Sequence, residues 1–138
     1  MGLVLLDTTF LIDTERDSGD LNSVIADEDD VAIAEITVAE LLVGVELASQ
    51  SHRERRELFV EDLVTSLHVI PYDLGIAREH ALLLAAVRRA GRPQGAHDLL
   101  IAATARATQR AIVTADASAF HDLPGVEVRS HGTGPNSP

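Results

Sequence analysis

The clearest chemical signal in this sequence comes from four acidic residues that lie far apart in the chain: Asp7, Glu40, Asp98 and Asp116. Two of them follow short apolar runs, at residues 3–6 and 111–113, which are typical of buried strands. The other two belong to helical patterns that begin near residues 37 and 97. Open α/β sheets bind ligands beyond the carboxyl ends of their parallel strands. We therefore expect the four carboxylates to meet at that edge of a sheet.

Four carboxylates gathered at one place predict a site for a hard divalent cation. Like charges at close range repel, so at least one carboxyl group would stay protonated without a cation. Oxygen ligands of this kind suit Mg²⁺ and Mn²⁺. One or two such ions would activate water for attack on phosphorus and stabilise the departing oxygen. The pattern thus favours metal-assisted cleavage of a phosphodiester.

Each acid alone also has a purely structural interpretation. Asp7 and Asp98 could cap the helices that they precede, and Asp116 could begin a turn. Glu40 is harder to explain in this way, because Gly44 shares its helix face and a mid-helix glycine costs about 1 kcal/mol relative to alanine. That glycine could leave room for a metal or a substrate beside Glu40, although close packing of the helix on the sheet is the simpler explanation for it.

Hydroxyl groups close to the acids are candidates for orienting them. Thr8 follows Asp7 directly, and Thr114 lies two residues before Asp116. A hydroxyl at either position could hold a carboxylate or an attacking water in place. Thr9 is explained by the preference of strand ends for threonine. We interpret His97 as a helix cap or a support for the acids, because water activated by a metal needs no histidine base.

Apolar periodicity predicts a single domain in which strands alternate with helices. We expect strands at about residues 3–6, 31–34, 67–70, 111–114 and 126–128, and helices at about 9–15, 21–26, 73–90 and 97–108, with two more beginning at Thr37 as a cap and at Ser51. This order indicates a three-layer α/β/α sandwich with a mainly parallel sheet of four to five strands. Residues 1–129 would form the domain, and 130–138 a disordered tail.

The composition excludes several classes of protein. There is no cysteine, which rules out disulfides, thiolate catalysis and cysteine-ligated zinc. All eleven basic residues are arginine, so the Gly-Lys pair of a phosphate-binding P-loop is absent. Phosphoaspartate folds typically need a lysine as well. Haloacid-dehalogenase-like phosphatases also need a second aspartate where Thr9 stands.

The net charge of −11 does not suit a protein that holds nucleic acid by counterion release alone. Either the substrate is engaged locally, by metal and a few arginines, or the standing partner of the protein is basic. No apolar run approaches the roughly 20 residues that span a bilayer, and no secretory signal is apparent. We expect a soluble, cytoplasmic protein.

Several segments of the chain resemble the PIN domain and, more narrowly, the VapC ribonuclease toxins of bacterial toxin–antitoxin pairs. They are Leu-Asp-Thr-Thr at 6–9, Ile-Thr-Val-Ala-Glu-Leu at 36–41 with Gly44, His-Asp-Leu-Leu-Ile-Ala-Ala-Thr-Ala at 97–105, and Val-Thr-Ala-Asp at 113–116 with Phe120 and Leu123-Pro124-Gly125. The likeness extends from Leu3 to about Val128, with the segments in the order and spacing of the family.

The resemblance implies a Mg²⁺-dependent endoribonuclease, usually a homodimer, that a small VapB-type antitoxin holds inactive in a larger complex. The metal ligands of the family fall on Asp7, Glu40, Asp98 and Asp116. Ala119 stands where many members carry a further acid or asparagine, which leaves open whether one or two ions bind. Two alternatives remain: a free-standing PIN nuclease of RNA maturation or decay, and a catalytically inactive PIN-like binding module.

Overall fold

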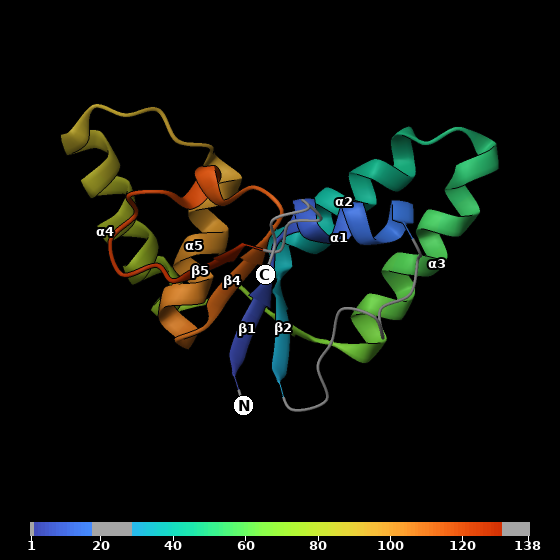
Figure 1. The fold of residues 1–138 in the computed structure, drawn as a ribbon, viewed down its shortest axis with the longest axis horizontal. Coiled ribbons are helices and arrows are strands. Elements are labelled where there is room, and N and C mark those ends of the chain that lie inside the picture. Colours follow the sequence, from blue (N-terminus) through green and yellow to red (C-terminus); the bar gives the residue numbers. More distant parts are fainter. Residues whose placement is uncertain (1, 18–28, 131–138) are drawn as a thin grey trace.

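A computed structural model describes residues 2–17 and 29–130, which fold into three layers around a central sheet (Figure 1). The described strands are β1 (Leu3–Leu6), β2 (Asp30–Ala34), β3 (His68–Ile70), β4 (Ala111–Thr114) and β5 (Val128–Ser130). They form one sheet in the order β3-β2-β1-β4-β5, and every neighbouring pair is parallel. The expected α/β/α sandwich with a parallel sheet is therefore confirmed.

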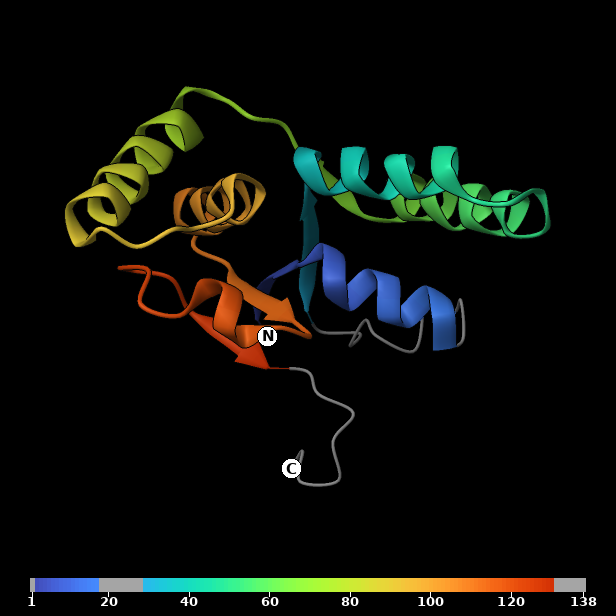
Figure 2. The same ribbon diagram turned by 90° about the horizontal axis from the view of Figure 1, so that it is seen from above.

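Helices cover both faces of this sheet. In the described part of the chain they are α1 (Thr8–Asp17), α2 (Glu35–Leu47), α3 (Gln50–Ser66), α4 (Leu74–Ala90), α5 (Ala96–Thr108) and the short 3₁₀ helix η2 (Ala117–Phe120). Figures 1 and 2 show α4 and α5 on one side of the sheet and α1, α2 and α3 on the other. Within the described residues, no helix combines the length and apolarity that a membrane span requires.

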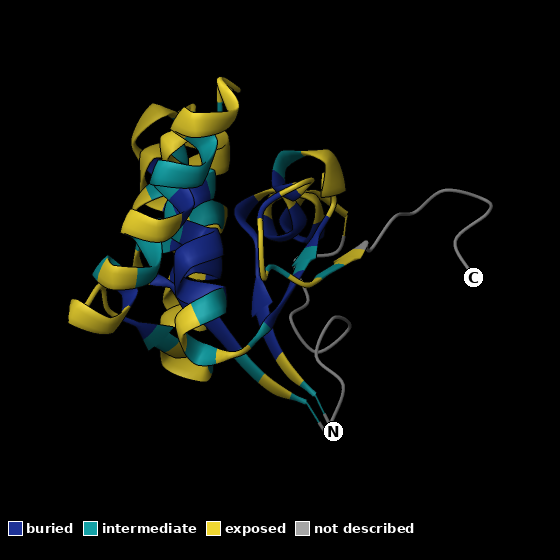
Figure 3. Ribbon diagram, turned by 90° about the vertical axis from the view of Figure 1, so that its left-hand side faces the viewer, coloured by how far each residue is buried: buried dark blue, intermediate teal, exposed yellow. Residues whose placement is uncertain are grey.

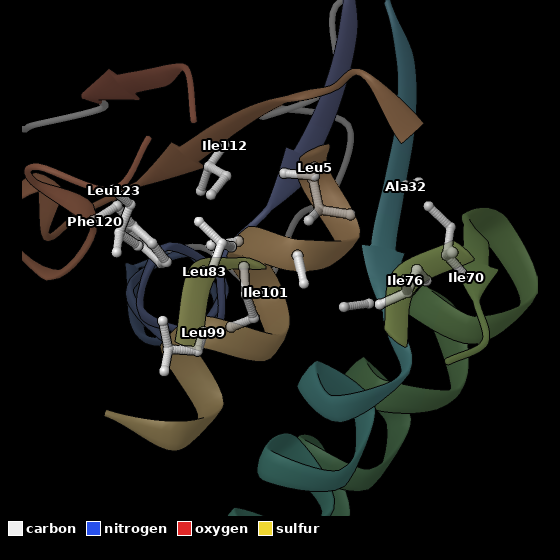
Figure 4. Close-up of a cluster of buried hydrophobic side chains, with 14 residues drawn as sticks. Leu5, Ala32, Ile70, Ile76, Leu83, Leu99, Ile101, Ile112, Phe120 and Leu123 are labelled. Carbon is white, nitrogen blue, oxygen red and sulfur yellow. The ribbon is translucent and has the colours of Figure 1, made fainter. Parts of the chain in front are cut away.

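Successive residues of each inner strand supply two separate cores. Leu5 and Ile112 pack with α4 and α5, whereas their neighbours Leu6 and Val113 pack with α1, α2 and α3. This alternation follows from the two-residue period of a strand. Figure 3 shows that the central strands and the inner faces of the helices are buried. Figure 4 shows the first core, to which the following side chains also contribute: Ala32, Ile70, Ile76, Leu83, Leu99, Ile101, Phe120 and Leu123.

The strand order creates a switch point between β1 and β4. From β1 the sheet continues through β2 to β3 on one side, and through β4 to β5 on the other. Because all strands are parallel, their carboxyl ends share one edge, and the crevice at such a switch point is where open α/β sheets bind ligands. Asp7 follows β1 at this edge, and Asp116 lies two residues beyond β4.

Two expectations about individual elements need correction, and two others lie outside the described residues. Thr37 does not cap α2: the helix begins at Glu35, directly after β2, and Thr37 is fully buried inside it. The last strand is Val128–Ser130, so it starts later than expected and includes the first residue assigned to the tail. The helix expected at 21–26 and the tail at 131–138 fall outside the described residues.

Candidate active site

The Asp7 carboxylate is buried at the end of β1 and is held by three donors. It is 2% exposed. Its Oδ1 accepts the Thr8 amide at 2.8 Å, and its Oδ2 accepts the hydroxyls of Thr9 at 2.8 Å and Thr114 at 2.7 Å. The Thr114 hydroxyl in turn accepts the Asp116 amide at 3.0 Å. One buried hydroxyl therefore ties the acid after β1 to the turn after β4. The interpretation of Thr9 as a mere strand-end residue was wrong, because its hydroxyl reaches Asp7.

Glu40 is oriented from two sides, by α1 and by α5. Its Oε1 accepts the Thr8 hydroxyl at 2.7 Å, and its Oε2 lies 3.0 Å from Nδ1 of His97. The Thr8 hydroxyl also lies 3.3 Å from that of Thr37, which explains why a polar residue is buried in α2. The Thr8 hydroxyl thus contacts Glu40, and not the Asp7 carboxylate that precedes it in the sequence. His97 contacts Glu40 from the start of α5. The sequence did not indicate which acid it would contact.

Asp98 lies in the first turn of α5, where the helix dipole favours an acid. Burial raises the pKa of its carboxyl group above the usual value, and the nearby charges of Asp7, Glu40 and Asp116 raise it further, in that order. His97 acts in the opposite direction. Asp7, Glu40 and Asp116 therefore lie near enough to Asp98 to act on it electrostatically. The Asp98 carboxylate accepts no hydrogen bond from any described residue, whereas that of Asp116, which is exposed, accepts the Ser118 hydroxyl at 2.5 Å.

The donor chemistry of this edge fits a hard divalent cation, because it offers carboxylate oxygens with hydroxyl groups behind them. As the side chains stand, however, no group of three or more Asp, Glu or His residues in the described ranges is arranged to hold a metal ion. Asp7, Glu40 and Asp116 are turned toward protein donors. For all four acids to coordinate one ion, the side chains of Asp7, Glu40 and Asp116 would have to turn from these donors toward an ion shared with Asp98.

A groove of about 230 Å³ leads away from Glu40 between α1, α2 and α3. Its lining combines apolar side chains with charged ones: Ile12, Leu41, Phe59 and Val60 with Glu15, Arg16 and Arg56. Gly44 lines it too, and a Cβ atom on this glycine would meet nothing within 4 Å. The explanation of Gly44 by close packing on the sheet was therefore wrong. This glycine opens onto the groove that Glu40 also lines.

Comparison with known proteins gives a consistent result for most of the chain. The family model of the PIN domain matches residues 4–126. The tRNA(fMet)-specific endonuclease VapC of Salmonella typhimurium is 31% identical over 98 residues, which cover 71% of this chain and 73% of that protein. Ribonuclease VapC5 of Mycobacterium tuberculosis is 33% identical over 112 residues, which cover 81% and 82%.

A solved structure agrees with these sequence matches. The DNA-bound VapBC structure from Salmonella typhimurium contains a chain that matches this one with a TM-score of 0.79 at 28% identity, over 94% of this chain and 98% of that one. The chain therefore belongs to the PIN domain family and, within it, to the VapC ribonucleases.

Proposed function

We propose that this protein is the toxin of a type II toxin–antitoxin pair and that it cleaves RNA as a divalent-metal-dependent endoribonuclease. Mg²⁺ would be held by Asp7, Glu40, Asp98 and Asp116, with Mn²⁺ as a possible substitute. The proposal rests mainly on Asp98, because its carboxylate lies within the electrostatic influence of three other acids and accepts no hydrogen bond from the described chain. Bound at such a carboxylate, a divalent cation would offset the negative charge of the phosphodiester. It would also lower the pKa of water, so that hydroxide is available to attack phosphorus.

The neighbouring side chains would keep the acids in place for this role. Thr9 and Thr114 hold one oxygen of Asp7 and the Thr8 amide holds the other, so that the carboxylate keeps a defined direction. Thr8 and His97 hold the two oxygens of Glu40. Groups that orient a ligand in this way typically change metal affinity or activity by 10- to 100-fold when they are removed. His97 would act by donating a hydrogen bond to Glu40 and not as a general base.

The proposal is tested by a cleavage assay on structured RNA. The purified protein should cut with Mg²⁺ or Mn²⁺ and stop cutting in EDTA. Asp98→Asn should abolish cleavage and keep the fold, because the amide preserves the shape of the side chain but removes its charge and one of its two acceptor oxygens. Asp62→Asn, an exposed acid on α3, is the matched control and should cut normally. Cleavage by Asp98→Asn at the rate of the unsubstituted protein would contradict the assignment.

The acidic composition leads to the proposed partner, a VapB-type antitoxin with a basic arm. With a net charge of −11, the protein would attract such an arm. An arginine of the arm, forked onto the carboxylates near Asp98, would exclude the metal. The groove beside Glu40, which is lined in part by apolar side chains, would offer a binding path for this arm. Full nuclease activity in the partner-bound form would argue against this mode of inhibition and leave the free-standing nuclease as the better assignment.

The assembly and location that we propose follow from the same assignment. The toxin would form a homodimer in the cytoplasm and would combine with its antitoxin into a larger complex. Light scattering on the purified protein, alone and with its antitoxin, measures both masses. A monomer in both preparations would contradict the proposed assembly. A protein that cuts no RNA under any of these conditions would instead be the catalytically inactive binding module.

A further inference from the structure

The loop in front of α5 brings a glycine against the Asp98 carboxylate. A Cβ atom on Gly95 would lie 2.9 Å from Oδ2 of Asp98 and 3.5 Å from its Cγ. Nonbonded heavy atoms are best separated by about 3.5 Å or more. A side chain at residue 95 is therefore incompatible with the position that the carboxylate now occupies.

The backbone of Gly95 does not itself require glycine. Its φ and ψ angles are −61° and 134°, in the extended region that any residue adopts. Gly91 differs in this respect, because its φ of 66° lies in the left-handed region. At residue 95 the relevant property of glycine is the missing Cβ atom and not its conformational freedom.

The backbone around Gly95 is also held in place more firmly than the Asp98 side chain. The Gly95 carbonyl accepts the Leu99 amide at 3.1 Å and so begins α5. The Gln94 side chain donates a hydrogen bond to the Ala119 carbonyl, which ties the loop to η2. No donor in the described chain holds the Asp98 carboxylate in the same way. A methyl group at residue 95 would thus move the carboxylate, by about 0.5 Å, and leave the loop in place.

We propose that Gly95 is a positioning residue: its missing side chain determines where the Asp98 carboxylate lies relative to the other three acids. The functional part of this inference rests on the proposed metal-dependent activity. Small displacements matter at such a site, because misplacing a group by about 1 Å can cost 100-fold in rate. Hydrogen-bonded neighbours that orient a metal ligand change metal affinity by typically 10- to 100-fold when they are lost, and we expect displacement of the ligand itself to have an effect of that size.

The test compares Gly95→Ala with Gly75→Ala. Gly75 lies in the first turn of α4, and a Cβ atom there would meet Oδ1 of Asp73 at 3.4 Å, an ordinary contact. Mn²⁺ affinity is measured by electron paramagnetic resonance of the free ion, and Tm by calorimetry. Gly95→Ala should bind Mn²⁺ roughly 10- to 100-fold more weakly, with Tm lowered by no more than about 5 °C. Gly75→Ala should match the unsubstituted protein in its Mn²⁺ affinity.

A double-mutant cycle shows whether Gly95 acts through Asp98. In the Asp98→Asn background, Gly95→Ala should cause no further loss of Mn²⁺ affinity, because the carboxylate that it displaces is already gone. An equal loss in both backgrounds, or Mn²⁺ binding by Gly95→Ala at full affinity, would overturn the inference. A Tm loss well beyond about 5 °C would also overturn it, since the backbone would then be what yields.

A crystal structure of Gly95→Ala separates this inference from the proposed function. The inference predicts an unchanged loop and a displaced Asp98 carboxylate, whether or not the protein binds Mn²⁺. An unmoved carboxylate would overturn it. An unsubstituted protein that binds no Mn²⁺, together with a displaced carboxylate in the variant, would reject the metal site and leave the positioning role standing.

Discussion

Replacing Thr114 by valine removes one hydroxyl and keeps the shape of a fully buried side chain. That hydroxyl donates to Oδ2 of Asp7 at 2.7 Å and accepts the Asp116 amide at 3.0 Å. A hydrogen bond to a charged acceptor contributes about 1.5–3 kcal/mol, and an amide left without an acceptor costs about 1 kcal/mol or more. Asp7 keeps two other donors, the Thr8 amide and the Thr9 hydroxyl, which offset part of the loss.

We therefore expect Thr114→Val to lower the free energy of unfolding by about 2–3 kcal/mol in urea titration. RNA cleavage should fall roughly 10- to 100-fold, because the Asp7 carboxylate loses the hydrogen bond that holds it from β4. Thr65→Val is the matched control: the Thr65 hydroxyl is exposed and donates only to carbonyls of its own helix. Its effect should stay within about 0.5 kcal/mol. If Thr114→Val were as stable and active as this control, the hydrogen bond from Thr114 to Asp7 would not support the site.

Three further predictions concern charge, helix propensity and the far edge of the sheet. Because the folded-state pKa of Asp98 is raised, the folded protein binds more protons than the unfolded chain between the ordinary pKa of 3.8 and the raised value. Ionisation of Asp98 therefore lowers the stability of the folded protein as pH rises through that window. Asp98→Asn should raise the Tm measured by calorimetry at pH 7, and this gain should vanish as pH falls toward 4. Gly44→Ala should stabilise the protein by about 0.5–1 kcal/mol in urea titration, because it sits within α2 with open space beside it. Arg110→Met should lower the free energy of unfolding by about 2–3 kcal/mol in the same assay, because the Arg110 guanidinium donates to the carbonyls of Val4 and Asp30 and to the Asp30 carboxylate. Cleavage per folded molecule should stay unchanged.

The order and type of the described elements were predictable because strands and helices differ in their apolar period. The runs at 3–6 and 111–114 became β1 and β4 with the expected bounds, since both are short, mainly aliphatic and largely buried. The helix expected at 73–90 became α4: Asp73 caps its start by accepting the Ile76 amide at 2.9 Å, and Gly91 ends it with a left-handed φ. Local chemistry determines each of these features.

Features that depend on tertiary contacts were not predictable in this way. Thr37 has the type of a capping residue, yet it is buried inside α2 beside Thr8, and Ala34 precedes the helix with no side-chain cap. The contact between His97 and Glu40 joins residues that are 57 positions apart, and it depends on how α2 and α5 are oriented at the sheet edge. The space that Gly95 leaves for Asp98 depends on a side-chain direction that no spacing in the sequence reveals.

The claim on which this account depends is that Asp7, Glu40, Asp98 and Asp116 share a bound divalent ion. Crystals soaked in Mn²⁺ and measured at the manganese absorption edge test it directly. We expect an anomalous peak at the carboxyl edge of the sheet, with oxygens of Asp98 and at least one other of these acids about 2.1 Å away. Crystals with Mn²⁺ bound only elsewhere, and with these four carboxylates free of any peak, would contradict it.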